Sequence, residues 1–160
     1  PSEAYKAISW QVIILLAALI PLGHVIHSSG TSALVGDSLS KILDIFPNHL
    51  QPYVLVSLMY LITTILTEIS SNAATAILMT PIALAVSANL NLDPRPFIFA
   101  ICYAASASFI TPIGYQTNLM VYGPGGYKFT DYVKVGFPLA IILWIIATIC
   151  IPMFWPFMVI

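Results

Sequence analysis

Two short polar segments interrupt long apolar stretches of this chain, and they hold the side chains best suited to binding chemistry. The first covers residues 68–75 (Glu-Ile-Ser-Ser-Asn-Ala-Ala-Thr) and the second covers residues 111–118 (Thr-Pro-Ile-Gly-Tyr-Gln-Thr-Asn). Their hydroxyl, amide and carbonyl oxygens are hard ligands, which suit a cation such as Na⁺. Irregular backbone is tolerated at membrane depth only where it is buried in protein or lines a cavity. We therefore interpret each segment as a break in a helix that could bind an ion.

Each segment also has a plainer interpretation. Residues 70–75 could form an ordinary extramembrane turn, with a helix N-cap at Ser71 or Asn72. Residues 111–118 could be a simple kink caused by proline and glycine. Glu68, the only acid within the long apolar region, is either an intramembrane functional group or a helix end near water. The residues alone leave these alternatives open.

The composition places both segments in a membrane protein. The 160 residues are 59% apolar and 7% charged, with five basic and six acidic residues and a net charge of −1. A soluble domain carries about 25% charged residues, so this composition excludes a soluble globular domain. The near-neutral charge and the lack of a basic patch argue against nucleic-acid binding.

Long charge-free blocks predict helices that cross the membrane. The blocks cover residues 7–36, 45–67, 69–92, 96–127 and 135–160. Because about 20 helical residues span the hydrocarbon core, these blocks are long enough for four to six membrane segments. Uninterrupted apolar runs favour helices over barrel strands, which would alternate polar and apolar residues. The loop charges favour neither membrane orientation.

Proline, glycine and polar clusters divide the blocks into elements. We expect a flanking helix and an interfacial segment over residues 7–46, and helices over residues 53–67, 76–90, 97–110 and 137–158. The chain begins at Pro1, without an initiator methionine or a leader, so we expect it to be the C-terminal part of a longer protein.

Enzymes and channels have weaker support than a carrier. No CxxC, HExxH, GxSxG or Walker pattern occurs, so we expect neither enzyme activity nor an organic cofactor. Residues 111–115 faintly resemble a K⁺-filter loop, but Pro112 intrudes and Gln116 replaces the second glycine. An ion channel is therefore a distant alternative.

The two polar segments also carry a family resemblance, which covers nearly the whole chain. Residues 67–75, followed by an apolar helix with Pro81, resemble the second Ser-Asn-Thr motif of the divalent anion/sodium symporter family. This group contains the sulfate, dicarboxylate and citrate carriers of the ion transporter superfamily. Residues 106–126 resemble the unwound helix and following loop of its C-terminal repeat. The chain is most similar to a branch of prokaryotic and algal permeases with cytosolic regulatory domains between their halves.

The resemblance implies an all-α integral membrane fold, namely one inverted repeat of an elevator-type transporter with a re-entrant helical hairpin and a broken transmembrane helix. Residues 53–90 would be the hairpin region, with its tip at residues 70–73. Residues 97–122 would be the broken helix, with its gap at residues 111–118. The whole chain, 1–160, would pair with the N-terminal repeat of the same protein. The complete permease would be a homodimer in the lipid bilayer of the plasma (inner) membrane.

The same resemblance implies the site residues and the transported species. Na⁺ would be the coupling ion, with ligands from Thr67, Ser70, Asn72 and Gly114, several of them backbone carbonyls. A small inorganic or carboxylate anion would contact Ser71, Asn72, Ala73, Tyr115, Thr117 and Asn118.

Two departures from the family pattern bear on the substrate. Ala73 stands where the motif has threonine, and residues 115–118 replace the Thr-Pro-Pro-Asn of dicarboxylate carriers. Both departures favour sulfate or another inorganic anion. The alternatives are a dicarboxylate or citrate carrier, and an arsenite or Na⁺/H⁺ antiporter of the same superfamily.

Overall fold

The structure is a computed structural model that describes residues 10, 13–14, 17–18, 21, 25 and 28–158. All regular structure in this part of the chain is helical, as expected. The helices are α3 (Thr31–Leu43), α4 (Gln51–Thr67), α5 (Asn72–Asn89), α6 (Arg95–Ser106), α7 (Gln116–Tyr122) and α8 (Phe129–Phe154). The flanking helix expected at the start of residues 7–46 lies mostly outside the described residues, and the later part of that range contains α3.

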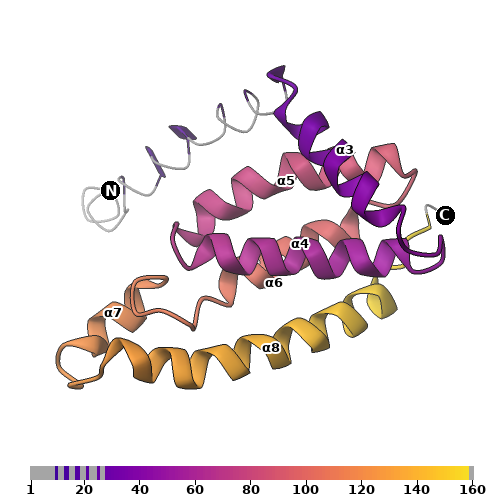
Figure 1. Ribbon diagram of the computed structural model, residues 1–160. Helices are drawn as coiled ribbons and strands as arrows, with labels where there is room; N and C mark the ends of the chain where they lie inside the picture. Colours follow the sequence, from indigo (N-terminus) through magenta and orange to yellow (C-terminus); the bar gives the residue numbers. More distant parts are fainter. Residues whose placement is uncertain are drawn as a thin grey trace.

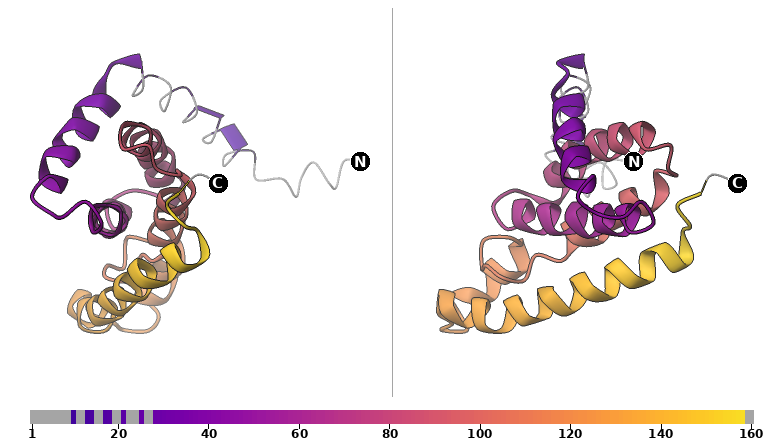
Figure 2. Two further views of the ribbon diagram at one scale, coloured as in Figure 1. Left: turned by 90° about the vertical axis from the view of Figure 1, so that its right-hand side faces the viewer. Right: turned by 45° about the vertical axis from the view of Figure 1, so that its right-hand side comes forward.

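Helix α4 lies at the centre of the described bundle, where it packs against α3, α5, α6 and α8 (Figure 1). Helix α5 lies on one side of α4 and α8 on the other, while α6 contacts both α5 and α8. Helix α8 forms an outer layer along the length of the bundle (Figure 2). The irregular chain between α6 and α7 lies between the end of α4 and the first half of α8.

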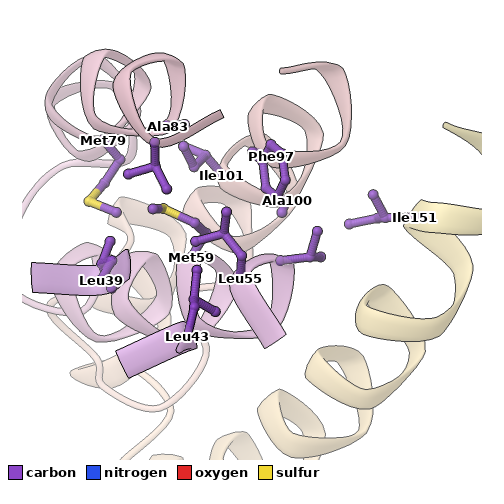
Figure 3. Close-up of a cluster of buried hydrophobic side chains, with 12 residues drawn as sticks. Leu39, Leu43, Leu55, Met59, Met79, Ala83, Phe97, Ala100, Ile101 and Ile151 are labelled. Carbon is purple, nitrogen blue, oxygen red and sulfur yellow. The ribbon is translucent and has the colours of Figure 1, made fainter. Parts of the chain in front are cut away.

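The core is a cluster of apolar side chains from α3, α4, α5, α6 and the end of α8 (Figure 3). Its buried members are Leu39, Leu43, Leu55, Val56, Met59, Met79, Ala83, Val86, Phe97, Ala100, Ile101 and Ile151. Small residues such as Ala83 and Ala100 let the α5 and α6 backbones approach closely. Trp155, just after α8, stacks on Phe99 of α6 with ring centroids 3.9 Å apart, which fastens the end of α8 to the bundle.

Two described helices, α5 and α8, have the length and hydropathy to cross a membrane, and α4 is apolar but shorter. The described residues therefore hold fewer full-length spans than the four to six expected. One reason is α6, which has 12 residues and ends at Ser106, although its charge-free block continues. The chain leaves the helix at Ala107 (φ −96°, ψ 49°) and runs through irregular backbone.

The last helix begins earlier than expected, at Phe129 instead of residue 137. The Asp131 carboxylate accepts a hydrogen bond from the Lys128 backbone N–H at 2.8 Å, which caps the first turn. The helix ends at Phe154 instead of residue 158, because Trp155 is extended (φ −126°, ψ 93°) and precedes Pro156.

The turn between α5 and α6 is closed by Asp93, which lies outside both helices, and by Arg95, the first residue of α6. The buried Asp93 carboxylate accepts hydrogen bonds from the Arg95 backbone N–H at 2.9 Å and from its guanidinium at 2.8 Å. The guanidinium hydrogen bond, the backbone hydrogen bond and the charge of Arg95 together lower the pKa of Asp93.

This pair gives a pH-dependent contribution to stability. Since the pKa of Asp93 is lowered in the folded state, the ionised pair stabilises the fold at neutral pH. That contribution is lost as the pH falls below the ordinary aspartate pKa of 3.8. We expect Asp93→Asn to lower the Tm of the purified full-length protein at pH 7, with a smaller difference from wild type below the ordinary pKa. Asp37→Asn, at an exposed position of α3, is the control. A Tm difference that stays constant across this pH range would contradict the role of the ionised pair.

Candidate functional site

The two polar segments meet in the structure. The α4–α5 turn (residues 67–72) contacts the irregular segment (residues 107–115) that connects α6 to α7. We call this contact, together with the start of α7, the junction. It joins residues that are about 40 positions apart in the chain, for example Thr67 with Ser108 and Glu68 with Thr111.

The turn and the gap both begin earlier in the chain than expected. The expected tip at residues 70–73 becomes a turn at residues 68–71, because Ser71 is the N-cap of α5. Ser71 is extended (φ −67°, ψ 146°), and its hydroxyl accepts a hydrogen bond from the Ala74 backbone N–H at 3.3 Å. The expected gap at residues 111–118 lies instead at residues 107–115, so Thr117 and Asn118 belong to α7.

Glu68 fastens the irregular segment to the turn. Its side chain is only 6% exposed, and its two carboxylate oxygens accept hydrogen bonds from the backbone N–H groups of Ile110 (2.9 Å) and Thr111 (2.8 Å). Burial of a carboxylate is costly unless its oxygens are paired, and here each oxygen has a main-chain donor. Glu68 is indeed at a helix end, as the C-cap of α4, but its side chain points into protein.

Thr111 and Gly114 complete this side of the junction. The Thr111 hydroxyl donates to the Glu68 carbonyl oxygen at 3.3 Å and accepts from the Gly114 backbone N–H at 3.0 Å. A Cβ atom on Gly114 would lie 2.1 Å from Ser108 Oγ and 2.8 Å from Glu68 Oε2. A side chain at position 114 would therefore displace hydroxyl or carboxylate oxygens of this network.

Thr67 and Asn72 link the two ends of the turn. The fully buried Thr67 Oγ1 lies 2.9 Å from Asn72 Oδ1 and 2.9 Å from the Ala105 carbonyl oxygen. A hydroxyl has one proton, so Thr67 donates to one of these acceptors at a time or shares its proton between them. The Ser108 hydroxyl donates to the Thr67 carbonyl oxygen at 3.3 Å. The turn, the end of α6 and the irregular segment thus share one hydrogen-bond network.

Asn118 closes the irregular segment from α7. Its side-chain Nδ2 donates to the carbonyl oxygens of Ser108 (2.9 Å) and Thr111 (3.2 Å). Its own carbonyl oxygen accepts from the Tyr132 hydroxyl of α8 at 2.8 Å. The Asn118 side-chain amide therefore binds both ends of the backbone loop of residues 108–111. Helix α8 in turn binds the main chain of Asn118.

The structure brings together most of the residues expected to bind Na⁺. Thr67 contacts Asn72 directly, and Gly114 lies against Ser108 and Glu68 in the same network. Ser70 lies in the same turn, where its backbone N–H donates to the Leu66 carbonyl oxygen at 2.9 Å.

The residues expected to bind the anion fall into two groups. Ser71, Asn72 and Ala73 form the start of α5, and Ser71 is exposed. Tyr115, Thr117 and Asn118 form the start of α7, where Tyr115 and Thr117 are exposed. Of this second group, the Asn118 side chain is the one that hydrogen-bonds within the junction in the part of the chain described.

The junction offers oxygens for a cation and backbone N–H groups for an anion. Carbonyl, hydroxyl and amide oxygens surround a single buried carboxylate, which is a donor set suited to a hard cation. The start of α5 presents the positive end of the helix dipole, which favours an anion. These oxygens and the start of α5 are therefore adjacent, and Asn72 belongs to both.

Three residues of the network were not expected as site residues. Glu68 was noted as a lone acid in an apolar region, and that isolation is the signal that could have selected it. Ser108 lies in a run of small residues typical of close helix packing. Tyr132 resembles an interfacial anchor, and nothing in the local sequence indicates that its hydroxyl reaches Asn118.

The chain is similar to a transporter family profile and to several known transporters. A family profile described as "Citrate transporter" matches residues 1–104 and 74–159. An uncharacterized transporter of Synechocystis is 53% identical over 143 residues, which are 89% of this chain and 23% of the relative. Sodium/sulfate cotransporter 2 of Chlamydomonas reinhardtii is 34% identical over 91% of this chain and 16% of the relative. Sodium-dependent high-affinity dicarboxylate transporter 3 of Caenorhabditis elegans is 34% identical over 79% of this chain and 22% of the relative.

The chain thus spans less than a quarter of the length of these relatives. The family match covers nearly all of its residues, and it confirms the kinship with divalent anion/sodium symporters that the two polar motifs indicate. The relatives are transporters, so the expectation of a membrane protein that is not an enzyme is confirmed as well. This chain belongs to the citrate transporter family.

Proposed function

We propose that the complete protein is a secondary active transporter that couples Na⁺ to the uptake of a divalent anion such as sulfate. The observation that carries this proposal is the junction, where oxygens of the turn and of the irregular segment converge around Glu68 and Gly114 beside the start of α5. Na⁺ would bind through oxygens of Thr67, Ser70, Asn72 and Gly114. The anion would contact Ser71, Asn72, Ala73, Tyr115, Thr117 and Asn118.

The charge of the junction supports a cation as one transported species. The Glu68 carboxylate is buried and bonded to two neutral N–H groups, which pair its oxygens but leave its charge uncompensated. A cation bound at the neighbouring carbonyl oxygens would balance that charge in a low-dielectric site. Relatives whose names state sodium dependence support Na⁺ as that cation.

The start of α5 supports an anion as the other species. The first backbone N–H groups of a helix have no intrahelical acceptor, and Ser71 caps only those of Ala74 and Thr75. The N–H groups of Asn72 and Ala73 therefore remain for a ligand at the exposed side of Ser71. Ala73 brings no hydroxyl, which is the departure that favours an inorganic anion over a carboxylate.

Asn72 offers a physical route for coupling the two species. Its side-chain Oδ1 faces Thr67 within the proposed Na⁺ site, while its backbone N–H belongs to the start of α5. A bound Na⁺ would order this residue, and an ordered start of α5 would bind the anion more tightly. Linkage then requires the anion to raise the affinity for Na⁺ by the same factor.

We further propose that the chain is the C-terminal repeat of an elevator-type permease. Residues 53–90 would be the re-entrant hairpin, residues 97–122 the broken helix and residues 137–158 part of the last membrane helix. An N-terminal repeat would supply the other half of the anion pocket, and the permease would be a homodimer of the plasma (inner) membrane. The short α6 and the irregular backbone after it support the broken helix.

The test is uptake of radiolabelled sulfate by the full-length protein in proteoliposomes. We expect uptake that saturates, that requires an inward Na⁺ gradient and that fails when K⁺ replaces Na⁺. Excess thiosulfate should compete, because it shares the shape and charge of sulfate, whereas succinate should not.

Other outcomes would point to the alternatives. Competition by succinate or citrate would make the protein a carboxylate carrier. A requirement for a pH gradient, or transport of arsenite, would indicate an antiporter of the same superfamily. Flux that does not saturate with sulfate would indicate a channel.

A further inference from the structure

Helix α8 touches the junction at two points that the proposed function does not use. The Tyr132 hydroxyl donates to the Asn118 carbonyl oxygen at 2.8 Å. Gly136 lies one helical turn further along, on the same face of α8. A Cβ atom on Gly136 would come within 2.0 Å of the Phe109 carbonyl oxygen and within 2.8 Å of Ile110 Cα. Four of these five residues, all except Ile110, line one cavity of about 420 Å³ between α8 and the irregular segment.

The irregular segment needs such contacts because it lacks the regular main-chain hydrogen bonds of a helix. In a helix the i→i−4 hydrogen bonds set the direction of each carbonyl group. Between Ala107 and Tyr115 that direction depends on neighbouring groups instead. The Glu68 carboxylate holds two N–H groups from the side of the turn. From the opposite side, the Asn118 amide holds the carbonyl oxygens of Ser108 and Thr111.

Each contact of α8 fixes one feature of the irregular segment on the side opposite Glu68. The Tyr132 hydrogen bond fixes the main chain of Asn118, and therefore the place from which its amide reaches Ser108 and Thr111. The contact at Gly136 is between two backbones, so it sets how closely α8 and the irregular segment approach. A side-chain rotation cannot relieve a clash with Phe109 main-chain atoms.

We propose that Tyr132 and Gly136 are positioning residues, through which α8 fixes the backbone of residues 108–111 and so sets the affinity of the junction for Na⁺. This inference rests on the proposed function, because it takes Na⁺ as the cation. Neither residue is expected to touch the ion. Both act on the backbone of the irregular segment and of Asn118, away from the start of α5. Because Asn118 is also a proposed anion contact, the effect on the Na⁺ affinity should exceed the effect on the anion affinity at saturating Na⁺.

The first test is Tyr132→Phe in the full-length protein, with Tyr127→Phe as the matched control. Tyr127 is exposed, and its ring packs edge-on against Tyr132 with centroids 6.1 Å apart, so the control removes a hydroxyl from the same aromatic group. We expect Tyr132→Phe to raise the half-saturating Na⁺ concentration for uptake about fivefold, the effect of one hydrogen bond. The KM for sulfate at saturating Na⁺ should change less than the half-saturating Na⁺ concentration, and Tyr127→Phe should leave both unchanged.

A second readout does not depend on transport. A ligand that binds only the folded state stabilises it by RT ln(1 + [L]/Kd), so the rise in Tm at a given ligand concentration is smaller when Kd is larger. The increase in Tm on adding Na⁺ to purified protein should therefore be smaller in Tyr132→Phe than in wild type. Gly136→Ala should reduce the Na⁺-dependent increase in Tm further than Tyr132→Phe does. Gly123→Ala should leave that increase unchanged, since a Cβ there meets nothing within 4 Å.

The outcomes separate this inference from the proposed function. Wild-type protein that shows neither Na⁺-driven uptake nor a Na⁺-dependent Tm would overturn both. With wild-type behaviour as proposed, an unchanged half-saturating Na⁺ concentration in Tyr132→Phe would overturn the inference alone. An equal fall in Tm with and without Na⁺ would also overturn it, because a merely structural role predicts that result. If Gly136→Ala does not fold, Tyr132→Phe decides.

Discussion

Glu68→Gln in the complete protein is expected to raise the half-saturating Na⁺ concentration for uptake by about 10- to 100-fold. Glutamine keeps the shape of the side chain but replaces one acceptor oxygen with an NH₂ group. That group would face the backbone N–H of Ile110 or Thr111, so one buried donor would lose its partner. The substitution also removes the negative charge beside the proposed cation site. Na⁺-dependent sulfate uptake in proteoliposomes, over a range of Na⁺ concentrations, measures the change.

Two further variants make this result specific. Asp44→Asn removes a carboxylate from an exposed position after α3, away from Glu68. It should keep the wild-type dependence on Na⁺. Glu68→Asp retains the charge on a shorter side chain and should fall between wild type and Glu68→Gln. A normal Na⁺ response in Glu68→Gln would show that the carboxylate does not organise the cation site.

Asn72→Ala in the complete protein should lose Na⁺-dependent uptake while the amount of protein in the membrane is retained. The fold should survive because the Thr67 hydroxyl, which loses Asn72 Oδ1 as an acceptor, still has the Ala105 carbonyl oxygen 2.9 Å away. The site should not survive, because the amide is the one side-chain group proposed to serve both Na⁺ and the anion. Uptake normalised to the protein content of the membrane measures the loss.

The matched control is Asn89→Ala, the same substitution at the exposed far end of α5. It should transport normally. If Asn72→Ala also transports normally and with unchanged Na⁺ dependence, Asn72 does not belong to the site. If both variants disappear from the membrane, the effect is on folding, and Asn72→Ser, which keeps a small polar side chain, should then restore the protein to the membrane with impaired uptake.

Much of the fold follows from composition and periodic apolar runs. The all-helical membrane class and the two polar interruptions follow from rules that apply to single segments: apolar length, polar content, and the cost of irregular backbone in lipid. The pairing of the two interruptions was expected only from the family resemblance. Element ends were less accurate because they depend on local contacts. The start of α5 depends on the backbone angles of Ser71, and the start of α8 depends on one hydrogen bond from Lys128 to Asp131.

The contacts of the site could not be predicted in the same way. Glu68 and Thr111 are 43 residues apart, and no local pattern specifies which main-chain donors a buried acid will find. The same is true of Tyr132, whose partner is a backbone carbonyl with no chemical signature in the sequence. The individual ligands of Na⁺ and of the anion stay predictions, which the uptake experiments above test.

The contact of Glu68 with the irregular segment depends on main-chain atoms. Glu68 binds N–H groups of the main chain, which every residue except proline provides, so the identities of residues 110 and 111 are not tied to that contact. Tyr115 and Thr117, further along, are exposed and lie outside the anchorage. Selection on such a protein can change which anion fits the pocket, one exposed side chain at a time, without releasing the loop that the cation would require. Under the proposed function, the main-chain contacts that hold the cation site and the exposed residues that contact the anion can therefore change separately.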